Sequence, residues 1–421
     1  MNLLVLSINY TPEPTGFAPH TSALCEYLAS RGHLVKVITG FPFAPYWARW
    51  PEYRGKFIRS ELIKDVQILR LTHYIPRHPR RYIERVLMEG SFCLLAALDV
   101  FLDIRSRWDL VLYVGAQPSI AMLAKFIAFY RHIPYVVKIT DLATQAAVDA
   151  GLVKAPWLKR GLVKFEYSAY RNARGVIVLC PSFQSALIAN HYAPERIRVI
   201  PNSEDLDMIR STPTDHTFRK EYNLSADDFV VLNCGSMGIK QGLTNVVEAA
   251  QILKNECPQI KWVLVGDGEL KQTLERLIAK YGLNTQVRLL PLQPESQMST
   301  MFSSADVLLL NQLGSVRDSV IPGKLQTYMA AGRAVLAAVN PTSQAAELIR
   351  ESEGGVIVPP EDPTALANAV REMKTDWKAL QGMGERSRMY AEKHFDRKHI
   401  LAAQEAYLLE VVKKPQQPFI R

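Results

Sequence analysis

The 421-residue sequence has no uninterrupted apolar run of the length that crosses a membrane. A spanning helix needs about 20 apolar residues, whereas the most apolar stretch, residues 92–102, is roughly half that length and contains Asp99. The first eight residues are mostly apolar, but they lack basic flanking residues and are soon followed by Pro12. We therefore expect no transmembrane helix and no signal peptide, and we interpret the apolar start as a buried strand.

Cysteine is scarce as well. The five cysteines are widely scattered, and none belongs to a C-x2-C or histidine-containing cluster with the spacing of metal ligands. This pattern argues against a disulfide framework and against a structural zinc site. It predicts reduced, mostly buried thiols in a cytosolic protein: Cys25, Cys93, Cys180, Cys234 and Cys257.

The composition is that of a globular protein, with 48% hydrophobic and 22% charged residues. The formal net charge of +9 favours partners that carry phosphates or other negative charge. Phosphorylated ligands, anionic lipid and nucleic acid would all satisfy that charge. Because no recognised nucleic-acid motif is present, we expect no nucleic-acid partner.

Short β-branched segments alternate with longer helical patterns along the chain. This alternation predicts an α/β protein with parallel sheets built from β-α-β units. The rhythm stops once, in a polar stretch over residues 203–219, where we expect a linker. The predicted strands cover residues 3–8, 35–39, 67–71, 110–114, 135–139, 176–179 and 198–200 before the linker and 229–232, 262–265, 287–290, 307–310, 334–338 and 356–358 after it.

The interruption divides the chain into two Rossmann-like domains of similar size, expected at residues 1–203 and 204–396. Ligands of such sheets bind beyond the carboxyl ends of the strands, so we expect the two sheets to face a central cleft. The helical residues after 363 are too many for the second sheet alone. We expect the last helix, within residues 397–421, to cross back onto the first domain.

The strongest local motif is a glycine-rich loop that contains Gly235, Ser236 and Lys240 and leads from a strand into a helix. Backbone N–H groups at a helix start attract anions, and a lysine adds a positive charge. The glycine spacing matches neither G-x-G-x-x-G nor the P-loop, so a dinucleotide or Walker site is not expected. Two interpretations remain open here: a diphosphate site, or a plain turn beside a solvated lysine.

Two further turns follow strands at the same edge of this sheet. One contains Gly266 and Asp267, and an acid at that place also favours the helix start simply through the helix dipole. The other contains Asp318, Gly323 and Lys324 at the beginning of a short helix. A lysine in the first helical turn is unfavourable next to the dipole, so either an anionic partner or plain exposure to solvent explains Lys324.

In the first domain, two residues lie where ligands usually approach. Gly16 follows the first strand, where its lack of a side chain suits either close contact with a ligand or a turn with positive φ. Asp141 follows the strand that ends at residue 139, as a catalytic acid or as the cap of the next helix.

In their order and spacing these motifs resemble glycosyltransferase family 4, and within it the fucosyltransferases of colanic-acid-type exopolysaccharide synthesis. The resemblance extends over nearly the whole chain. Each motif is modest alone, but the series is specific for the family. It comprises Asn9–Glu13, Arg31–His33, Pro201-Asn202, Gly235–Gly242, Gly266–Gly268, Ala305–Val307 and Tyr328–Gly332.

The resemblance implies a GT-B fold and a retaining, metal-independent transfer of a hexose from a GDP- or UDP-linked sugar. The second domain would bind this nucleotide sugar, and the first would bind a lipid-linked or oligosaccharide acceptor. Lys240 and Lys324 would neutralise the diphosphate, and the leaving phosphate would itself take the proton of the acceptor. The implied catalytic residues are Asp141 and Lys240, and the implied donor-binding residues are Gly16, Gly235, Ser236, Lys240, Gly266, Asp267, Asp318, Gly323, Lys324 and Thr327.

The sequence departs from the family pattern in three places. Ser236 replaces the usual arginine after the strand glycine, and Thr140 replaces the usual histidine before Asp141. The family's Glu-x7-Glu motif falls on Ser319 and Thr327, so both acids are missing and Asp318 would take the first role. An Asp205-Leu206-Asp207 sequence matches a DxD metal motif, but we interpret it as chance because it lies in the linker.

A basic and apolar segment in the first domain suggests docking to an anionic membrane surface. Arg77, Arg80, Arg81 and Arg85 precede an apolar helix with Leu87, Phe92, Leu94, Leu95, Leu98 and Phe101. The alternative is that the apolar residues face the sheet and the arginines form a solvated rim. Together with the family resemblance, this segment predicts a peripheral protein at the cytoplasmic face of the cell membrane.

Two other functions remain open from the sequence alone. A sugar-nucleotide epimerase of GT-B shape would need a pair of acid and base side chains at the cleft, and no convincing pair is present. A non-catalytic basic module that binds nucleic acid or carbohydrate would satisfy the charge, but no recognised motif supports it.

Overall fold

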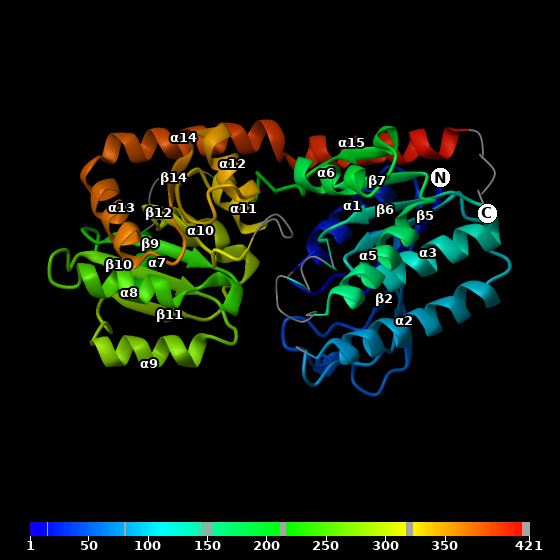
Figure 1. The fold of residues 1–421 in the computed structure, drawn as a ribbon, viewed down its shortest axis with the longest axis horizontal. Coiled ribbons are helices and arrows are strands. Elements are labelled where there is room, and N and C mark those ends of the chain that lie inside the picture. Colours follow the sequence, from blue (N-terminus) through cyan, green and yellow to red (C-terminus); the bar gives the residue numbers. More distant parts are fainter. Residues whose placement is uncertain are drawn as a thin grey trace. The chain divides into compact units, whose positions relative to one another are not determined.

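The computed structural model describes residues 1–414 except 15, 80, 143, 145–147, 149–152, 154, 211–215 and 317–322. The chain divides into two compact units (Figure 1). Met1–Asn202 and Lys398–Arg421 form the N-terminal unit, and Ser203–Arg397 form the C-terminal unit. Each of these bounds lies within one residue of the division expected from the sequence, and the roles assigned to the domains remain predictions.

The N-terminal unit is built on an eight-stranded sheet with the order β3-β4-β2-β1-β5-β6-β7-β8. Neighbouring strands are parallel except β3 and β4. The central strands are buried on both faces, as helices on both sides of a parallel sheet require. The strands are β1 (Asn2–Leu6), β2 (Leu34–Gly40), β3 (Ile58–Ile63), β4 (Val66–Leu71), β5 (Leu110–Gly115), β6 (Tyr135–Ile139), β7 (Gly175–Val178) and β8 (Ile197–Val199).

The edge strand β3 was not among the predicted strands. It forms an antiparallel hairpin with β4 through a two-residue turn, Lys64-Asp65, in which both residues have positive φ. Turns of this type usually contain Asn-Gly or Asp-Gly. Because this turn sequence is unusual, the amino-acid sequence alone did not predict the hairpin.

The N-terminal unit carries helices α1 (Ala18–Ser30), α2 (Tyr82–Leu102), α3 (Pro118–Arg131), α5 (Pro156–Tyr170), α6 (Pro181–Ala189) and α15 (Arg397–Lys413), and the 3-10 turns η1 (Pro51–Tyr53) and η2 (Pro194–Arg196). On one face, α1 and α15 share a buried cluster with strands β1, β2 and β5. α3 packs between α2 and α5. Among the described residues, no helix has both the length and the apolar character needed to cross a membrane.

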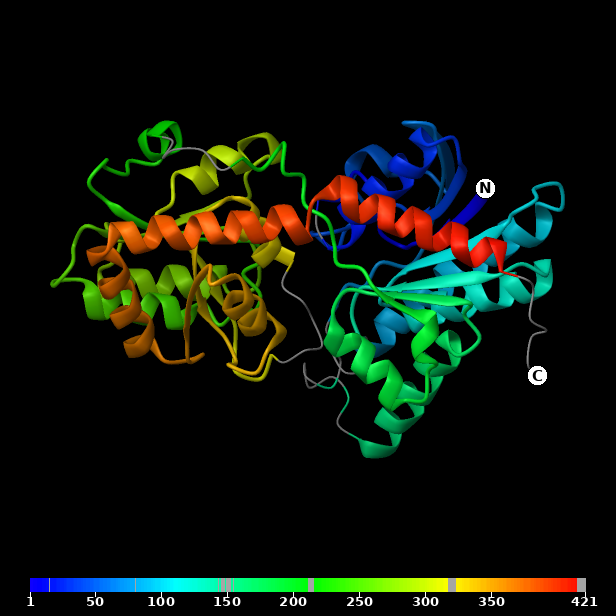
Figure 2. The ribbon, with the colours of Figure 1, turned by 90° about the horizontal axis from the view of Figure 1, so that it is seen from above.

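The last helix, α15, belongs to the N-terminal unit, as Figure 2 shows. The Tyr407 hydroxyl donates a hydrogen bond of 2.6 Å to the carbonyl oxygen of Arg196. A side chain on Gly175 would lie 2.4 Å from that hydroxyl, so β7 and α15 are in close contact. The predicted return of the last helix to the first domain is confirmed.

The C-terminal unit has a six-stranded, wholly parallel sheet with the order β11-β10-β9-β12-β13-β14. Its strands are β9 (Phe229–Cys234), β10 (Ile260–Val265), β11 (Val287–Leu290), β12 (Val307–Asn311), β13 (Ala334–Ala338) and β14 (Gly355–Val358). Its helices are α7 (His216–Glu221), α8 (Thr244–Leu253), α9 (Lys271–Tyr281), α10 (Met298–Ser303), α11 (Gly323–Ala330), α12 (Gln344–Ser352), α13 (Pro363–Thr375) and α14 (Trp377–His394), with 3-10 turns η3 (Ile239–Gln241) and η4 (Glu295–Gln297).

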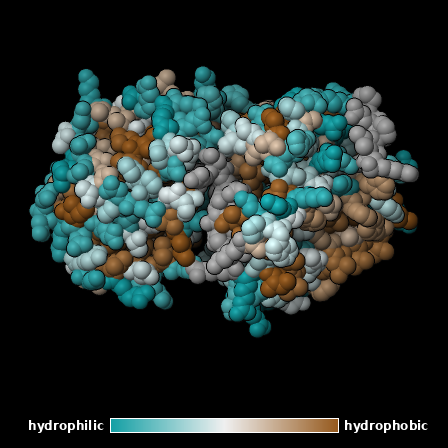
Figure 3. All heavy atoms as spheres, in the orientation of Figure 1, coloured by the Kyte–Doolittle hydropathy of each residue, from teal (hydrophilic) through white to brown (hydrophobic). Residues whose placement is uncertain are grey.

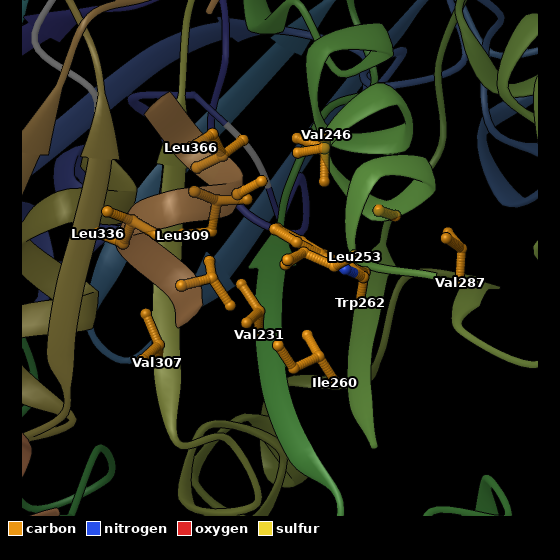
Figure 4. Packing of buried hydrophobic residues seen from close by; sticks show 14 of the residues in the cluster. Val231, Val246, Leu253, Ile260, Trp262, Val287, Val307, Leu309, Leu336 and Leu366 are labelled. Carbon is orange, nitrogen blue, oxygen red and sulfur yellow. The ribbon is translucent and has the colours of Figure 1, made fainter. Parts of the chain in front are cut away.

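Successive residues of β9 enter different clusters, which shows that the sheet is buried on both faces. Val231 packs with Trp262 and Leu309 on one side (Figure 4), whereas Val230 and Leu232 pack on the other. This burial holds the strands in one register. The loops at their carboxyl ends therefore start from fixed positions.

Candidate functional site

The first two glycine loops of the C-terminal unit are in direct backbone contact. Gly235 follows β9 and Gly266 follows β10, and both have positive φ, at 132° and 149°. A Cβ atom on Gly266 would lie 1.8 Å from the carbonyl oxygen of Gly235. Only glycine is compatible with this contact, because the neighbouring group is backbone and has no room to move.

A second set of contacts continues the pairing of these loops. Met237 donates its N–H to the carbonyl oxygen of Asp267 at 2.8 Å, and Leu270 donates to that of Met237 at 2.9 Å. A Cβ on Gly268 would lie 2.8 to 2.9 Å from three backbone atoms of Met237. The two loops therefore form one rigid rim at the carboxyl edge of the sheet.

Lys324, in the first turn of α11, extends its side chain to this rim. Its Cδ would lie 3.9 Å from a Cβ on Gly235, and its ammonium donates a 2.5 Å hydrogen bond to Oε1 of Gln241. Burial lowers the pKa of Lys324 to about 8, although the nearby Cys234 partly offsets this. Keeping the Lys324 ammonium charged at this position therefore costs desolvation free energy. Among the described residues, no carboxylate forms an ion pair with it.

Lys240 lies on the same loop as Gln241, within η3. Its carbonyl oxygen accepts from the Leu313 N–H at 3.0 Å, and the Asn311 side chain donates to the carbonyl oxygens of Gln241 and Gly242. The backbone of Lys240 is therefore fixed to the end of β12. In the part of the chain that the structure describes, the half-buried Lys240 side chain has no hydrogen bond or ion pair.

Three other predicted donor residues lie in the loops after β9 and β10 and at the start of α11. Ser236 is exposed, and its hydroxyl lies 3.3 Å from the position of a Cβ on Gly238. Asp267 is exposed, and its carboxylate accepts from the Gly268 N–H at 2.7 Å and lies 3.9 Å from the Lys271 ammonium. Gly323 begins α11, and a Cβ added to it would have no atom within 4 Å.

Thr327 and Asp318 are not part of the observed rim contacts. The Thr327 side chain forms a hydrogen bond with Glu204, a buried carboxyl whose pKa burial raises to about 8. Glu204 is also bound through its backbone to Phe395 and Arg397. Asp318 lies outside the described residues.

Gly16 and Asp141 belong to the N-terminal unit. Gly16 has a φ of 66°, and no atom would contact an added Cβ, so the turn itself accounts for glycine at this position. Asp141 follows β6 and is half-buried. Much of the segment after it lies outside the described residues, and both roles of Asp141 remain predictions.

The described residues contain no group of three or more histidine, cysteine, aspartate or glutamate side chains arranged to hold a metal ion. In the DxD sequence, Asp205 pairs with Arg397 at 2.7 Å and accepts hydrogen bonds from the N–H groups of Asp207 and Met208. These contacts give Asp205 a structural role in the linker.

The structure adds two polar residues that received no role from the sequence, Gln241 and Tyr328. Gln241 orients the Lys324 ammonium, and the Tyr328 hydroxyl bonds both the N–H and the carbonyl oxygen of Cys234, at 2.8 and 3.2 Å. Tyr328 belongs to a motif noted in the sequence, but its contact spans 94 residues and has no local signal.

Two family descriptions match the chain and together account for most of it. The glycosyl transferase 4-like domain matches residues 15–203, and glycosyl transferases group 1 matches residues 214–390. The chain is a family 4 glycosyltransferase. This assignment decides against the epimerase and the non-catalytic module that the sequence left open.

A curated relative of this glycosyltransferase is the putative colanic acid biosynthesis glycosyl transferase WcaI of Escherichia coli (strain K12). It is 28% identical over 410 residues, which cover 95% of this chain and 98% of WcaI. The expected similarity to colanic-acid glycosyltransferases is confirmed.

Solved structures confirm the GT-B fold. Anabaena HepE, in complex with UDP and with UDP-glucose, has a TM-score of 0.72 at 16% identity in each case, over 97% of this chain and 100% of that chain. WaaG, described as a glycosyltransferase involved in lipopolysaccharide biosynthesis, has a TM-score of 0.71 at 16% identity, over 98% of this chain and 100% of that chain.

Proposed function

We propose that this glycosyltransferase moves a hexose, with retention of configuration and without a metal ion, from a nucleoside diphosphate sugar to a lipid-linked or oligosaccharide acceptor of exopolysaccharide synthesis. The rim of the C-terminal unit would bind the diphosphate. The observation that carries the proposal is the half-buried Lys324, whose pKa desolvation lowers, beside two interlocked glycine loops.

The electrostatics of the rim suit a dianionic leaving group. An anion that binds next to a lysine whose pKa is lowered by burial stabilises the charged form and raises that pKa again. Lys240 provides a second ammonium. Because hydrogen bonds already fix the backbone of Lys240, little rearrangement is needed when charge develops on the diphosphate. Preorganised cations of this kind take the place of a metal ion in the proposal.

The donor base is proposed as uracil or guanine. HepE, which shares the fold, is described with UDP-glucose, and the resemblance to colanic-acid-type fucosyltransferases implies a GDP-linked sugar. Neither observation selects the sugar itself. Thermal unfolding with UDP, GDP, ADP and CMP separates the bases, because a ligand at about 100 times its Kd stabilises the folded state by about 2.7 kcal/mol.

We expect one nucleoside diphosphate to raise the Tm of the full chain and the shift to disappear in Lys240→Ala. Lys378→Ala is the matched control, since Lys378 is an exposed lysine of α14 in the same unit. Chelation with EDTA should leave the shift unchanged. No shift with any nucleotide, or an equal loss in Lys378→Ala, would contradict the proposed donor site.

We further propose peripheral docking of the N-terminal unit to the anionic inner face of the cell membrane. The outer face of α2 exposes a leucine and isoleucine stripe, and α3 adds Phe126 and Phe129. Figure 3 shows apolar side chains gathered over α2 and α3. Arg77 and Arg81, both exposed, precede the stripe, which consists of Ile83, Leu87, Leu94, Leu98 and Leu102.

One residue of the predicted membrane face is instead part of the core. Phe92 is fully buried, together with Met88, Ala96 and Val100 on the opposite stripe of α2. A helix of period 3.6 places these two stripes on different faces. The interpretation of Phe92 as a lipid contact was wrong.

Vesicle binding tests the docking face. Leu94→Ser/Leu98→Ser should reduce co-sedimentation with phosphatidylglycerol vesicles, and phosphatidylcholine vesicles should bind the unmodified chain weakly. Leu34→Ser/Leu62→Ser is the control, because both leucines are similarly exposed but lie on β2 and β3. Equal binding by all three proteins would overturn the docking proposal.

A further inference from the structure

A groove in the N-terminal unit lies outside the features described above. It has a volume of about 690 Å³ and is formed by α5 and the turn that follows α6. Its lining combines four cations with two tyrosine rings and aliphatic side chains. The residues that matter here are Lys159, Arg160, Lys164, Tyr167 and Arg171 on α5 or directly after it.

Among the residues that the structure describes, no carboxylate forms an ion pair with Lys159, Arg160, Lys164 or Arg171. Elsewhere on the same unit, Lys36 and Lys64 each pair with a carboxylate, at 2.9 and 2.8 Å. The groove therefore has a positive potential that the described chain does not balance.

The spacing of these cations opposes helix stability. Arg160 and Lys164 are four residues apart, so they lie on the same side of α5, where like charges repel. Arg171 is close enough to Lys125 to add to the effect of burial in lowering the pKa of that lysine. An anion in the groove would relieve this repulsion, and the described chain provides none.

The size and lining of the groove indicate more than a bare phosphate. Its volume is many times the roughly 30 Å³ of a water molecule. Val163 and the Tyr167 ring supply apolar surface between the charges. Trp157, 75% exposed, precedes Arg160 by three residues and so lies on the adjoining row of the same helix.

We propose that this groove is a second anion site, separate from the donor rim, and that it binds the phosphate or diphosphate head of an amphiphile. The cations bind the head. Val163, Tyr167 and Trp157 contact the apolar portion next to it. The proposal requires no assumption about the nucleotide donor.

Isothermal titration of the full chain tests the site with three probes: farnesyl diphosphate, inorganic pyrophosphate and farnesol. Farnesyl diphosphate should bind most tightly, pyrophosphate more weakly, and farnesol not measurably. Arg160→Glu/Lys164→Glu should weaken farnesyl diphosphate binding roughly tenfold or more, because two charge-assisted contacts become repulsive. This change replaces one like-charged pair by another on an exposed helix face, so α5 should keep its stability.

The matched control is Arg54→Glu/Lys56→Glu. It changes the net charge of the same unit equally, at exposed positions next to β3, the far edge strand of the sheet. The control should bind farnesyl diphosphate like the unmodified chain. Equal affinities in all three proteins, or equal losses in both variants, would overturn the proposal.

Two further measurements locate the bound group and its source. Lys324→Met should retain farnesyl diphosphate affinity, and a loss there would place the diphosphate on the donor rim and overturn the second site. With phosphatidylglycerol vesicles, weaker binding of the groove variant than of the control would identify bulk phospholipid as a source. Equal vesicle binding together with the loss of farnesyl diphosphate affinity would identify a diphosphate amphiphile instead.

Discussion

Two lysines have a lowered pKa in different surroundings: the half-buried Lys324 in the C-terminal unit and the buried Lys138 in the N-terminal unit. Burial lowers the pKa of each to about 8, and a cysteine partly offsets the effect in both. Each ammonium donates to a glutamine, Gln241 or Gln404. The similarity shows that a perturbed pKa alone does not identify a functional lysine.

The surroundings distinguish the two. Lys138 lies inside β6, is 1% exposed, and reaches Gln404 of α15, which packs against the sheet. Lys324 starts a helix at the carboxyl edge of its sheet, beside glycines that leave backbone uncovered. We infer that Lys138 fastens α15 to the sheet, whereas Lys324 is available to a ligand.

The largest expected effect is that of Lys324→Met on transfer. Loss of a preorganised charge that stabilises a leaving group typically lowers the rate by about 10² to 10³. Replacement of a buried cation by an apolar side chain of similar volume costs little stability or even increases it. We expect initial rates of sugar transfer to fall by this factor while the Tm stays within a few degrees of the unmodified chain.

Lys138→Met should show the reverse. Gln404 would be left buried without its partner, at a cost of about 1–3 kcal/mol in the free energy of unfolding. Lys138→Met/Gln404→Met removes both groups and should recover most of that loss. Urea unfolding measures the stability, and transfer rates should remain near those of the unmodified chain. A rate loss like that of Lys324→Met would remove the distinction between the two lysines.

The sequence predicts those features of the two lysine sites that depend on residues close together in the chain, and it does not predict contacts between distant residues. The glycines at 235 and 266 were recognised because strand, glycine and helix follow one another directly in the chain. Their contact is local to two neighbouring strands. The lysine partners were not recognised, because Lys324 and Gln241 are 83 residues apart and Lys138 and Gln404 are 266 apart.

Features that depart from regular sequence patterns were also not predicted. The β3–β4 hairpin turns through Lys64 and Asp65, which are unusual for positive φ at both positions. Phe92 was assigned to a lipid-facing stripe because composition does not fix which face of an apolar helix meets the sheet. Thr327 was grouped with the donor residues by motif, whereas its observed partner is Glu204, more than one hundred residues earlier.

The pH dependence of stability and of binding should separate the lysines further. The folded pKa of each lies near 8 and below the ordinary value of 10.5, so the unfolded chain holds more protons between these values. The free energy of unfolding should therefore rise with pH from about 8 to 10.5, as the buried charges are lost. Nucleotide binding should fall over the same range, because the neutral Lys324 no longer attracts the diphosphate.

Each methionine variant removes one contribution to that profile. Both should flatten the rise in stability, but only Lys324→Met should remove the decline of nucleotide affinity near pH 8. Unfolding curves and titrations of the same samples, from pH 7 to about 10, measure the two effects together. An unchanged affinity profile in Lys324→Met would show that another group controls binding.

The smallest expected effect is that of Gln241→Ala on nucleotide affinity. Its Oε1 holds the Lys324 ammonium at 2.5 Å, and net hydrogen bonds to charged groups contribute about 1.5–3 kcal/mol, only part of which is lost once an anion binds. We expect Kd to rise a few-fold because Lys324 loses its orientation, and Gln404→Ala to leave Kd unchanged. A lower Kd in Gln241→Ala would mean that Gln241 competes with the diphosphate for Lys324. The glutamine would then restrain the lysine until the donor arrives, in contrast to Gln404, which has no ligand to compete with.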